Sequence, residues 1–517
     1  MDVCTNRRSF LRAAAAGAGV AVAAAGGVQP AQADEGVAGP ATDHNPVETV
    51  DCDVVVVGSG TGGTCAALRA AELGAKVVLL EKREVLGGSS FFTEGVGAIG
   101  SRLQKEQGIE IDIPEVYRRL QVFHHNAALG GPLMAYLQNS GATIDWMMDN
   151  GATFTTVFGV GDSIPAWHLP GTPTELVSVG AAVLTPLQER LQGMADVRTQ
   201  TPATDLVVED GRVTGVYATD ADGNEIRFNA SRGVILASGG YTNNKELFEE
   251  FTRFNHDDFY PWGVEGRDGD GIRMAREAAG AEMHCPGAVM YVTGHIVPSN
   301  YLGMDNSLFT FQPNFRVNEA GKRYFDESYC VDFSMCANAL LTQHHVVSIL
   351  DQSQLDALQT DGPVMQNMFI GGPVPDATEL CESSEAVVVC DTLEELAEAL
   401  DIDPEGLKAS VERYNGFCET GVDEDFGKPA EYLQPLTTPP YYGAVLHPDM
   451  FTTVGGIKVN ENLQVIDTEG HIVEGLYAVG SDAGAIYGDD YDVGVMSGSQ
   501  QGWASTGGKL AAEHIMA

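Results

Sequence analysis

The stretch Asp51-Cys-Asp-Val-Val-Val-Val-Gly-Ser-Gly-Thr-Gly-Gly63 decides the fold, because it joins an apolar strand to a glycine-rich turn. Its four consecutive valines are β-branched and apolar, as expected for a strand buried on both faces of a parallel sheet. Gly58, Gly60 and Gly63 have the spacing of a dinucleotide-binding turn. Glycines at these places permit a tight turn, close approach to a pyrophosphate and close packing of the next helix. We therefore predict a dinucleotide site.

The residues after this turn complete a nucleotide-binding βαβ unit. Residues 64–73 form a helix of small residues whose N-terminus faces the phosphates. A second apolar strand then ends at Glu81, 23 positions after Gly58. A carboxylate here accepts a ribose 2′-hydroxyl and repels a 2′-phosphate, which favours an adenosine without that phosphate. A tight turn that binds nothing would explain Gly58, but not a third glycine together with Glu81.

The N-terminal residues have the pattern of an export signal. In residues 1–33, the pair Arg7-Arg8 resembles the twin-arginine consensus and precedes an Ala/Gly/Val run at 13–25. This run is shorter than the ~20 apolar residues that span a bilayer. Residues 34–50 have the composition of a linker. We expect a protein that is exported folded to the periplasm or cell surface, with no membrane span in the mature chain.

Charge and cysteine usage exclude several classes of partner. With 72 acidic and 29 basic residues the formal net charge is −43, so binding to nucleic acid or an anionic membrane surface is not expected. The nine cysteines include no C-x-x-C pair, which argues against a zinc site, an iron–sulfur quartet or a covalent haem. We therefore expect no metal, and any electron donor must be a separate molecule.

The rest of the chain has the mixture of predicted helices and strands that is typical of an α/β protein. A segment of different amino-acid composition interrupts it. Residues 115–126, 133–151, 272–279 and 501–515 are expected to be helices. Residues 197–228 predict an antiparallel ribbon that turns at Glu209-Asp-Gly, and residues 233–240 and 475–480 predict two further buried strands. From about 292 to 434 aromatic, Asn and Cys residues and two acidic helices replace this pattern.

Several motifs together resemble the fumarate reductase/succinate dehydrogenase flavoprotein family, whose members include urocanate reductase and the 3-ketosteroid Δ1-dehydrogenases. Besides the glycine triplet and Glu81, they are Gly87-Gly-Ser-Ser90, Ala237-Ser-Gly-Gly240, Gly269-Asp-Gly271, Gly321-Lys-Arg-Tyr324, Thr453-Val-Gly-Gly456 and Gly475-Leu-Tyr-Ala-Val-Gly480. The resemblance implies non-covalent FAD in a two-segment Rossmann-like α/β domain, residues 51–291 and 435–517. An α+β capping domain, residues 292–434, is inserted between the segments.

The resemblance also implies the residues that hold FAD. Ala203 would offer its backbone to the adenine, and Ser481 or Asp482 would replace the glutamate that binds the ribityl chain in many relatives. The segment 497–499 would place helix N-terminal amides at flavin N1/O2. The complete set of expected cofactor-binding residues is Gly58, Gly60, Thr61, Gly62, Gly63, Glu81, Lys82, Gly87, Gly88, Ser89, Ser90, Gly95, Ala203, Ala237, Ser238, Gly239, Asp270, Gly480, Ser481, Asp482, Ser497, Gly498 and Ser499.

The chain departs from the family where fumarate reductases hold a dicarboxylate. At the positions of two arginines and a histidine it carries Tyr491, Val331 and Thr452, none of which forms a charge-assisted pair with a carboxylate. Tyr491 resembles the C-terminal tyrosine with which ketosteroid dehydrogenases polarise a carbonyl. Tyr329 lies near a second tyrosine of those enzymes, two positions out of register. Both are candidate catalytic residues, and the alternative for each is a packed aromatic side chain.

These features predict an FAD-dependent reductase that transfers a hydride to an activated C=C bond, of an enone or an unsaturated acid derivative other than fumarate. The aromatic residues Tyr487, Tyr491, Tyr329, Phe333 and Trp503 suggest a planar or hydrophobic small-molecule substrate. Electrons would come from an external cytochrome or quinol-linked protein. A dehydrogenase running the reverse reaction and a non-catalytic flavin-binding module remain alternatives.

Overall fold

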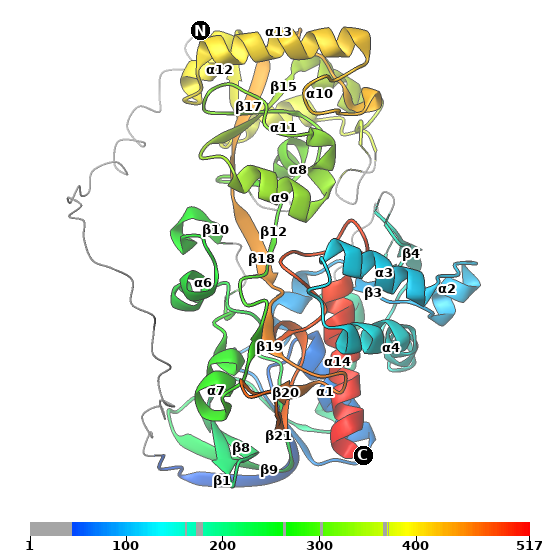
Figure 1. The fold of residues 1–517 in the computed structure, drawn as a ribbon, viewed down its shortest axis with the longest axis vertical. Coiled ribbons are helices and arrows are strands. Elements are labelled where there is room, and N and C mark those ends of the chain that lie inside the picture. The colour runs from blue at the N-terminus through cyan, green and yellow to red at the C-terminus, as the bar shows by residue number, and fades with distance from the viewer. Residues whose placement is uncertain are drawn as a thin grey trace, which may run out of the picture. The chain divides into compact units, whose positions relative to one another are not determined.

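The computed structural model describes residues 44–160, 163–171, 179–261, 265–299, 303–365, 370 and 372–517. Residues from Asp43 to the C-terminus form one unit (Figure 1). The expected export signal lies outside the described residues, and so does most of the expected linker. No helix in the described part of the chain has the length and hydropathy that crossing a membrane requires.

The largest sheet of the described chain has eight strands and a parallel centre. Its main order is β20 (Gln464–Ile466), β21 (Ile472–Ala478), β9 (Glu225–Leu236), β1 (Glu48–Val57), β2 (Val77–Leu80) and β6 (Asp196–Arg198). The five strands from β21 to β6 are parallel, and Val54 lies opposite both Val77 and Gly233. The buried strands expected from the sequence are therefore confirmed as neighbours in a Rossmann-like sheet.

An antiparallel ribbon extends this sheet, as predicted. β7 (Ala203–Glu209) pairs with β8 (Arg212–Thr219), and β8 pairs with β9. The sequence predicts two separate strands where β9 is one continuous strand, because β9 stays paired with β1 along its length. That pairing also includes the last three residues of the expected linker, since β1 begins at Glu48. These linker residues are largely exposed, so they carry no apolar strand pattern.

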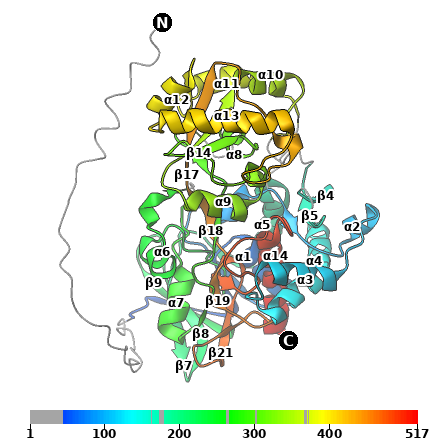
Figure 2. The ribbon, with the colours of Figure 1, turned by 45° about the horizontal axis from the view of Figure 1, so that its top comes forward.

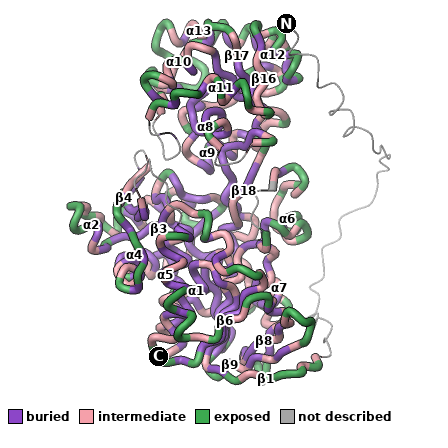
Figure 3. Tube along the Cα trace, turned by 180° about the vertical axis from the view of Figure 1, so that it is seen from behind, coloured by how far each residue is buried: buried purple, intermediate pink, exposed green. Residues whose placement is uncertain are grey.

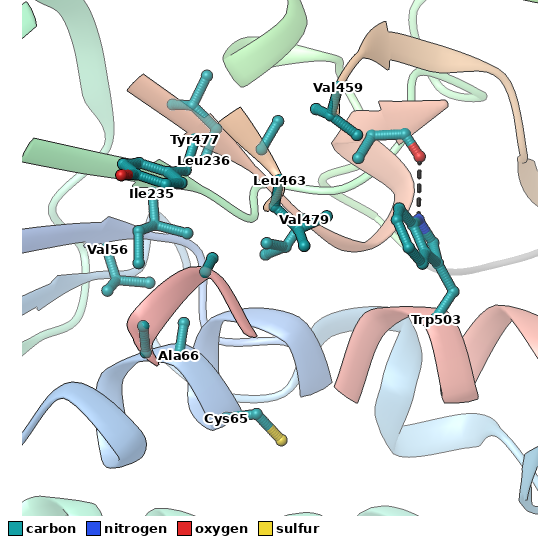
Figure 4. Packing of buried hydrophobic residues seen from close by; sticks show 14 of the residues in the cluster. Val56, Cys65, Ala66, Ile235, Leu236, Val459, Leu463, Tyr477, Val479 and Trp503 are labelled. Atoms are coloured by element: carbon teal, nitrogen blue, oxygen red, sulfur yellow. Dashed lines mark hydrogen bonds between the residues drawn. The ribbon is translucent and has the colours of Figure 1, made fainter. Parts of the chain in front are cut away.

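Two helices from opposite ends of the chain pack together against the sheet. They are α1 (Thr61–Glu72) and α14 (Ser499–Met516), and small residues let their backbones meet. A Cβ atom on Gly508 would lie 2.2 Å from the Gly62 carbonyl oxygen. In Figure 4, Val56, Ala66 and Leu236 pack in the same apolar cluster as Trp503, whose indole N–H donates to the Ala483 carbonyl at 3.1 Å.

Further helices and short strands surround this core. The predicted helices at 115–126, 133–151 and 272–279 are confirmed as α3, α4 and α7, with ends that differ by a few residues. The elements of this part are β3 (Val96–Gly97), α2 (Arg102–Glu106), α3 (Ile113–Phe123), α4 (Gly130–Asp149), β4 (Thr156–Phe158), β5 (Trp167–Leu169), α5 (Thr185–Gln192), α6 (Lys245–Phe251), β10 (Tyr260–Pro261), α7 (Asp270–Ala279), β11 (Met283–His284), β19 (Gly456–Lys458) and β22 (Ala483–Gly484).

The capping domain has its own sheet (Figure 2), and its side chains form two apolar clusters of their own among the described residues. Its strands are β13 (His295–Ile296), β14 (Phe315–Asn318), β15 (Val346–Asp351), β16 (Val388–Cys390) and β17 (Tyr441–His447). Its helices are α8 (Met304–Thr310), α9 (Phe333–Leu341), α10 (Gln352–Thr360), α11 (Ala377–Ser383), α12 (Leu393–Ala399) and α13 (Pro404–Thr420). Because β17 pairs with β15 and β16, the cap sheet continues beyond residue 434, where the sequence places the domain boundary.

Two paired strands connect the capping domain to the Rossmann-like domain. They are β12 (Val289–Tyr291) and β18 (Asp449–Thr453), which run antiparallel. Figures 1 and 3 show β18 at the junction of the two domains, and its chain is mostly buried there. The chain therefore enters and leaves the cap through adjacent strands, and residues on both strands can reach a site that lies between the domains.

Candidate active site

A large cavity opens at the carboxyl ends of the parallel strands. Val57, Leu80, Ala237 and Val479 line it, and each ends or directly follows a strand of the central sheet. The cavity encloses about 1680 Å³ of empty space, part of it open to solvent. The position is the edge at which open α/β sheets bind their ligands.

The glycine turn and helix α1 form one wall of the cavity. Gly58 has φ of 104°, and a Cβ atom there would lie 2.2 Å from the Ala237 carbonyl oxygen. A Cβ atom on Gly63 would lie 1.9 Å from the Gly58 carbonyl oxygen, so helix and turn meet only without side chains. Helix α1 begins after Gly60, which offers no capping side chain, and its first turn has no acidic residue, while its Thr61 N–H donates to the Ser90 hydroxyl at 3.0 Å. Its N-terminal dipole is therefore available to a phosphate.

The Glu81 carboxylate is held in place by the backbone around it. It is buried and accepts hydrogen bonds from the Ser59 hydroxyl at 2.6 Å, the Ser59 N–H at 3.1 Å and the Arg83 N–H at 2.9 Å. A carboxylate offers about four acceptor sites, so one remains for a ligand hydroxyl. Pro202 and Ala203 line the cavity as well, as expected for the adenosine end.

The opposite wall distinguishes the roles of Ser481 and Asp482. Asp482 is fully buried and accepts from the Ser238 hydroxyl at 3.0 Å and the Gly239 N–H at 3.1 Å, so it supports the wall from behind. Burial raises its pKa from 3.8 to about 7, although these hydrogen bonds oppose the shift. Ser481 lines the cavity, and its hydroxyl accepts from the Gln500 side chain at 2.8 Å. Of the two candidates, Ser481 is the one that faces the cavity.

The N-terminus of α14 closes the far end of the cavity. Ser497 and Gly498 line it, and Gly498 has φ of 76°. The Gly498 N–H donates to the Tyr491 phenol oxygen at 3.1 Å, so this amide is already used by the protein. The Ser499 hydroxyl does not reach the cavity and instead donates to the buried Asp492 carboxylate at 2.5 Å.

Tyr491 lines the cavity and is held by a buried polar network. Its phenol oxygen accepts from the Gly498 N–H at 3.1 Å, and the Ser499 hydroxyl makes a hydrogen bond with the Tyr487 hydroxyl at 2.8 Å. Burial, with a contribution from the Asp492 carboxylate, raises the pKa of Tyr491 well above its usual range. The phenol therefore keeps its proton across physiological pH and can donate a hydrogen bond.

Most of the residues expected to bind the cofactor line this cavity. They are Gly58, Gly60, Thr61, Gly62, Glu81, Lys82, Gly88, Ser89, Ser90, Gly95, Ala203, Ala237, Ser238, Gly239, Asp270, Gly480, Ser481, Ser497 and Gly498. The expected residues that do not line it are Gly63, Gly87, Asp482 and Ser499. Each of these four supports a lining residue through packing or hydrogen bonds. For example, the Gly87 N–H donates to the Ser59 hydroxyl at 2.9 Å.

The structure does not bring the second candidate catalytic residue, Tyr329, to the cavity. Its side chain is 46% exposed on a short 3₁₀ helix of the cap, which fits its displaced register. Of the other expected aromatic residues, Phe333 lines the cavity, whereas Tyr487 and Trp503 are buried behind its wall. Lining residues that the sequence did not suggest include Trp167, Met290, Phe451, Val493 and Thr93.

Glu94 is a charged lining residue that sequence reasoning missed. It is half-buried, and burial raises the pKa of its carboxyl from 4.5 to about 7. The signal was an acidic residue inside the glycine-rich stretch after Gly88, where apolar and small residues otherwise dominate. Arg267 also lines the cavity, and its Nε donates to the Asn243 side chain at 3.2 Å.

The cavity wall fits the FAD that the resemblance implies. Three buried side-chain oxygens on it have no hydrogen-bond partner among the described residues, namely Thr61 Oγ1, Gln500 Oε1 and Gln501 Oε1. Burying a polar atom without a partner costs ~1–3 kcal/mol. A polar ligand that runs from helix α1 to helix α14 would remove this cost. Thr61, Ser481, Gln500 and Gln501 are therefore suited to hold it, beside Glu81.

Comparisons with known proteins agree with this geometry. The sequence model of the family described as "FAD binding domain" matches residues 53–494. A vinyl phenol reductase of Lactiplantibacillus plantarum is 35% identical and covers 89% of this chain and 96% of its own length. A digoxin reductase of Eggerthella lenta is 31% identical and covers 92% and 90%. The open conformation of a flavocytochrome c3 fumarate reductase superimposes with a TM-score of 0.72 at 24% identity, over 91% of this chain and 78% of that one.

Proposed function

Because this chain belongs to the fumarate reductase/succinate dehydrogenase flavoprotein family, we propose that it reduces an alkene conjugated to a carbonyl group or an aromatic ring. Its cofactor is FAD, and it is an FAD-dependent oxidoreductase of the type that acts on C=C bonds. The substrate, the direction and the electron donor belong to the proposal. The observation that carries it is the aromatic and apolar wall that Phe333, Phe451 and Met290 form in the cavity that Tyr491 also lines.

The substrate argument rests on the residues at the capped end of the cavity. Phe333, Phe451 and Met290 line it with apolar surface, and Tyr491 adds one phenol. Thr452 and Tyr491 stand where fumarate reductases place carboxylate-binding groups, and neither carries a charge. A planar, largely apolar alkene fits such a wall better than a dicarboxylate, which needs bidentate cationic partners. The similarity to a vinyl phenol reductase supports an aryl-conjugated alkene.

Tyr491 has the position and protonation state to act on such a substrate. When bound and reduced, FAD supplies a hydride, which is two electrons and one proton. As the hydride reaches one alkene carbon, negative charge moves onto the conjugated oxygen or ring. The Tyr491 phenol stays protonated and can donate a hydrogen bond to that charge. Orienting the alkene against the apolar wall excludes water from the reacting carbons.

A substrate panel tests this proposal. We would reduce the purified yellow enzyme anaerobically with dithionite and add 4-vinylphenol, digoxin, urocanate, acrylate or fumarate, the compounds named for relatives. We expect rapid reoxidation of the flavin by conjugated aryl or carbonyl alkenes and none by fumarate. Reoxidation by fumarate alone would contradict the substrate argument.

We also propose export by the twin-arginine route and reduction by a separate cytochrome or quinol-linked protein. The Arg7-Arg8 pair supports export, and the absence of a C-x-x-C pair from the sequence supports an external donor. Replacing both arginines by lysine should leave the enzyme in the cytoplasmic fraction of its host. Unchanged fractionation would contradict the export proposal.

A further inference from the structure

Glu94 lies at the same end of the cavity as Tyr491. It stands two residues before β3, whose Gly97 N–H donates to the Gly498 carbonyl at 2.8 Å. The Gly498 N–H in turn donates to the Tyr491 phenol oxygen. The Glu94 carboxylate is also close enough to raise the pKa of Tyr491. Two titratable groups from distant parts of the chain therefore face the same end of the cavity.

The half-buried Glu94 carboxyl differs from the buried Glu81 and Asp482 carboxyls in having no side-chain partner among the described residues. Glu81 accepts three hydrogen bonds and Asp482 accepts two, whereas Glu94 has only its own backbone N–H among the described residues. No cation is paired with it there, although Lys82, Arg83 and Arg267 also line the cavity. An unpaired carboxylate in such a place is costly, so the neutral acid is favoured.

We propose that Glu94 is the catalytic acid that delivers the proton during alkene reduction. This inference rests on the proposed function. The hydride forms a C–H bond at one alkene carbon while the O–H bond of Glu94 breaks and its proton forms a C–H bond at the other. The C=C bond becomes CH–CH, the flavin is oxidised, and the carboxylate left on Glu94 regains a proton from solvent. The external donor then restores the reduced flavin.

The protonation states of the two groups assign them different tasks. A carboxylic acid with a pKa of about 7 is matched to proton transfer near neutral pH. The Tyr491 phenol, whose pKa is raised further above its usual value by burial and by Asp492, holds its proton too tightly to be the better donor. Tyr491 therefore polarises the substrate by a hydrogen bond, and Glu94 gives up the proton.

Stopped-flow reoxidation of the dithionite-reduced holoenzyme by 4-vinylphenol tests this assignment. Glu94→Gln should retain FAD and slow reoxidation by ~10²–10⁴-fold, the usual contribution of a general acid. The rate of the parent enzyme should fall as pH rises through about 7, because the acid must be protonated, and Glu94→Gln should lose this fall. Tyr491→Phe should be reoxidised more slowly than the parent at every pH, and its rate should still fall as pH rises through about 7. The control is Glu84→Gln, which changes the same charge at an exposed site and should behave like the parent.

A second readout is independent of turnover. The infrared band of a neutral carboxylic acid should disappear from the holoenzyme as pH rises through about 7, and Glu94→Gln should lack part of that change while Glu84→Gln retains it. Glu94→Asp keeps an acid and should recover part of the rate. Parental rate and pH profile in Glu94→Gln would overturn the inference and leave the proposed function standing. A loss of FAD in Glu94→Gln would overturn it in favour of a cofactor-binding role. If no alkene reoxidises the parent flavin, the proposed function fails, and the catalytic role of Glu94 fails with it.

Discussion

Replacing Gly508 by alanine tests whether the close contact between the first and last helices holds the cofactor site together. A Cβ atom on Gly508 would lie 2.2 Å from the Gly62 carbonyl oxygen and 3.1 Å from the Ala66 nitrogen, so α14 must move away from α1. Gly62 lines the cavity at the phosphate-binding end. The adjacent Gly507 is the matched control, because its Cβ would meet Leu463 side-chain atoms only at 3.5 Å.

The magnitudes follow from two opposing effects. Alanine in place of glycine inside a helix favours folding by ~1 kcal/mol, so Gly507→Ala should be neutral or slightly stabilising. Overpacking against backbone costs ~1–3 kcal/mol or more, which should outweigh that gain in Gly508→Ala. Each ~1.4 kcal/mol of strain that falls on the bound state weakens FAD binding about tenfold. We therefore expect a loss of FAD affinity of roughly tenfold in Gly508→Ala and none in Gly507→Ala.

Fluorescence titration of the apoproteins with FAD measures the affinity, and thermal unfolding of the same samples measures stability. Gly508→Ala should show a weaker dissociation constant and a smaller increase in melting temperature on adding FAD. Equal affinities and melting temperatures for the two variants would refute the reasoning, because the two positions differ chiefly in the clearance around their Cβ atoms.

Three further predictions concern other parts of the molecule. Tyr491→Phe should lower turnover at least tenfold with FAD still bound, whereas Tyr329→Phe should match the parent; equal rates for both variants would remove Tyr491 from the mechanism. The apoprotein should lose stability as pH rises from 3.8 to about 7, because the raised folded-state pKa of Asp482 favours folding only while the acid is protonated. Denaturant unfolding across this range should show a smaller pH dependence in Asp482→Asn, and an unchanged slope would contradict this. Arg323→Met should destabilise the cap in urea by less than the ~3–5 kcal/mol of a buried charge left with no partner, since it removes the bidentate partner of the Glu327 carboxylate, 2.7 Å from the guanidinium, but leaves the Lys428 ammonium 3.4 Å away. FAD affinity should stay at the parental value, because none of these residues lines the cavity.

The features that the sequence predicted best depend only on residues that lie close together in the chain. The strand before Gly58, the turn and Glu81 follow from spacing along a single βαβ unit, and the structure places them as expected. The sequence could not decide between Ser481 and Asp482, because the answer depends on which of them accepts the hydrogen bonds of Ser238 and Gly239, which follow strand β9.

The features that the sequence did not predict depend on contacts between segments that are far apart in the chain. Glu94 reaches the cavity because β3 is held by both β5 and the N-terminus of α14. Its own neighbours in sequence do not show that approach. The prediction that Tyr329 is catalytic was wrong for a related reason. On a short 3₁₀ helix, a shift of two positions turns a side chain from the protein interior to the solvent.

The pairing of α1 with α14 has a consequence for synthesis of the protein. Besides the packing of Gly62 against Gly508, the Arg69 side chain donates to Glu513, which lies 444 positions later in the chain. A ribosome must therefore synthesise the chain through α14 before α1 and α14 can pair. The inserted cap, with its own local contacts, is able to fold earlier. We therefore expect stable flavin binding only after α14 has been synthesised, and a nascent chain stalled before residue 499 should be colourless even in excess FAD.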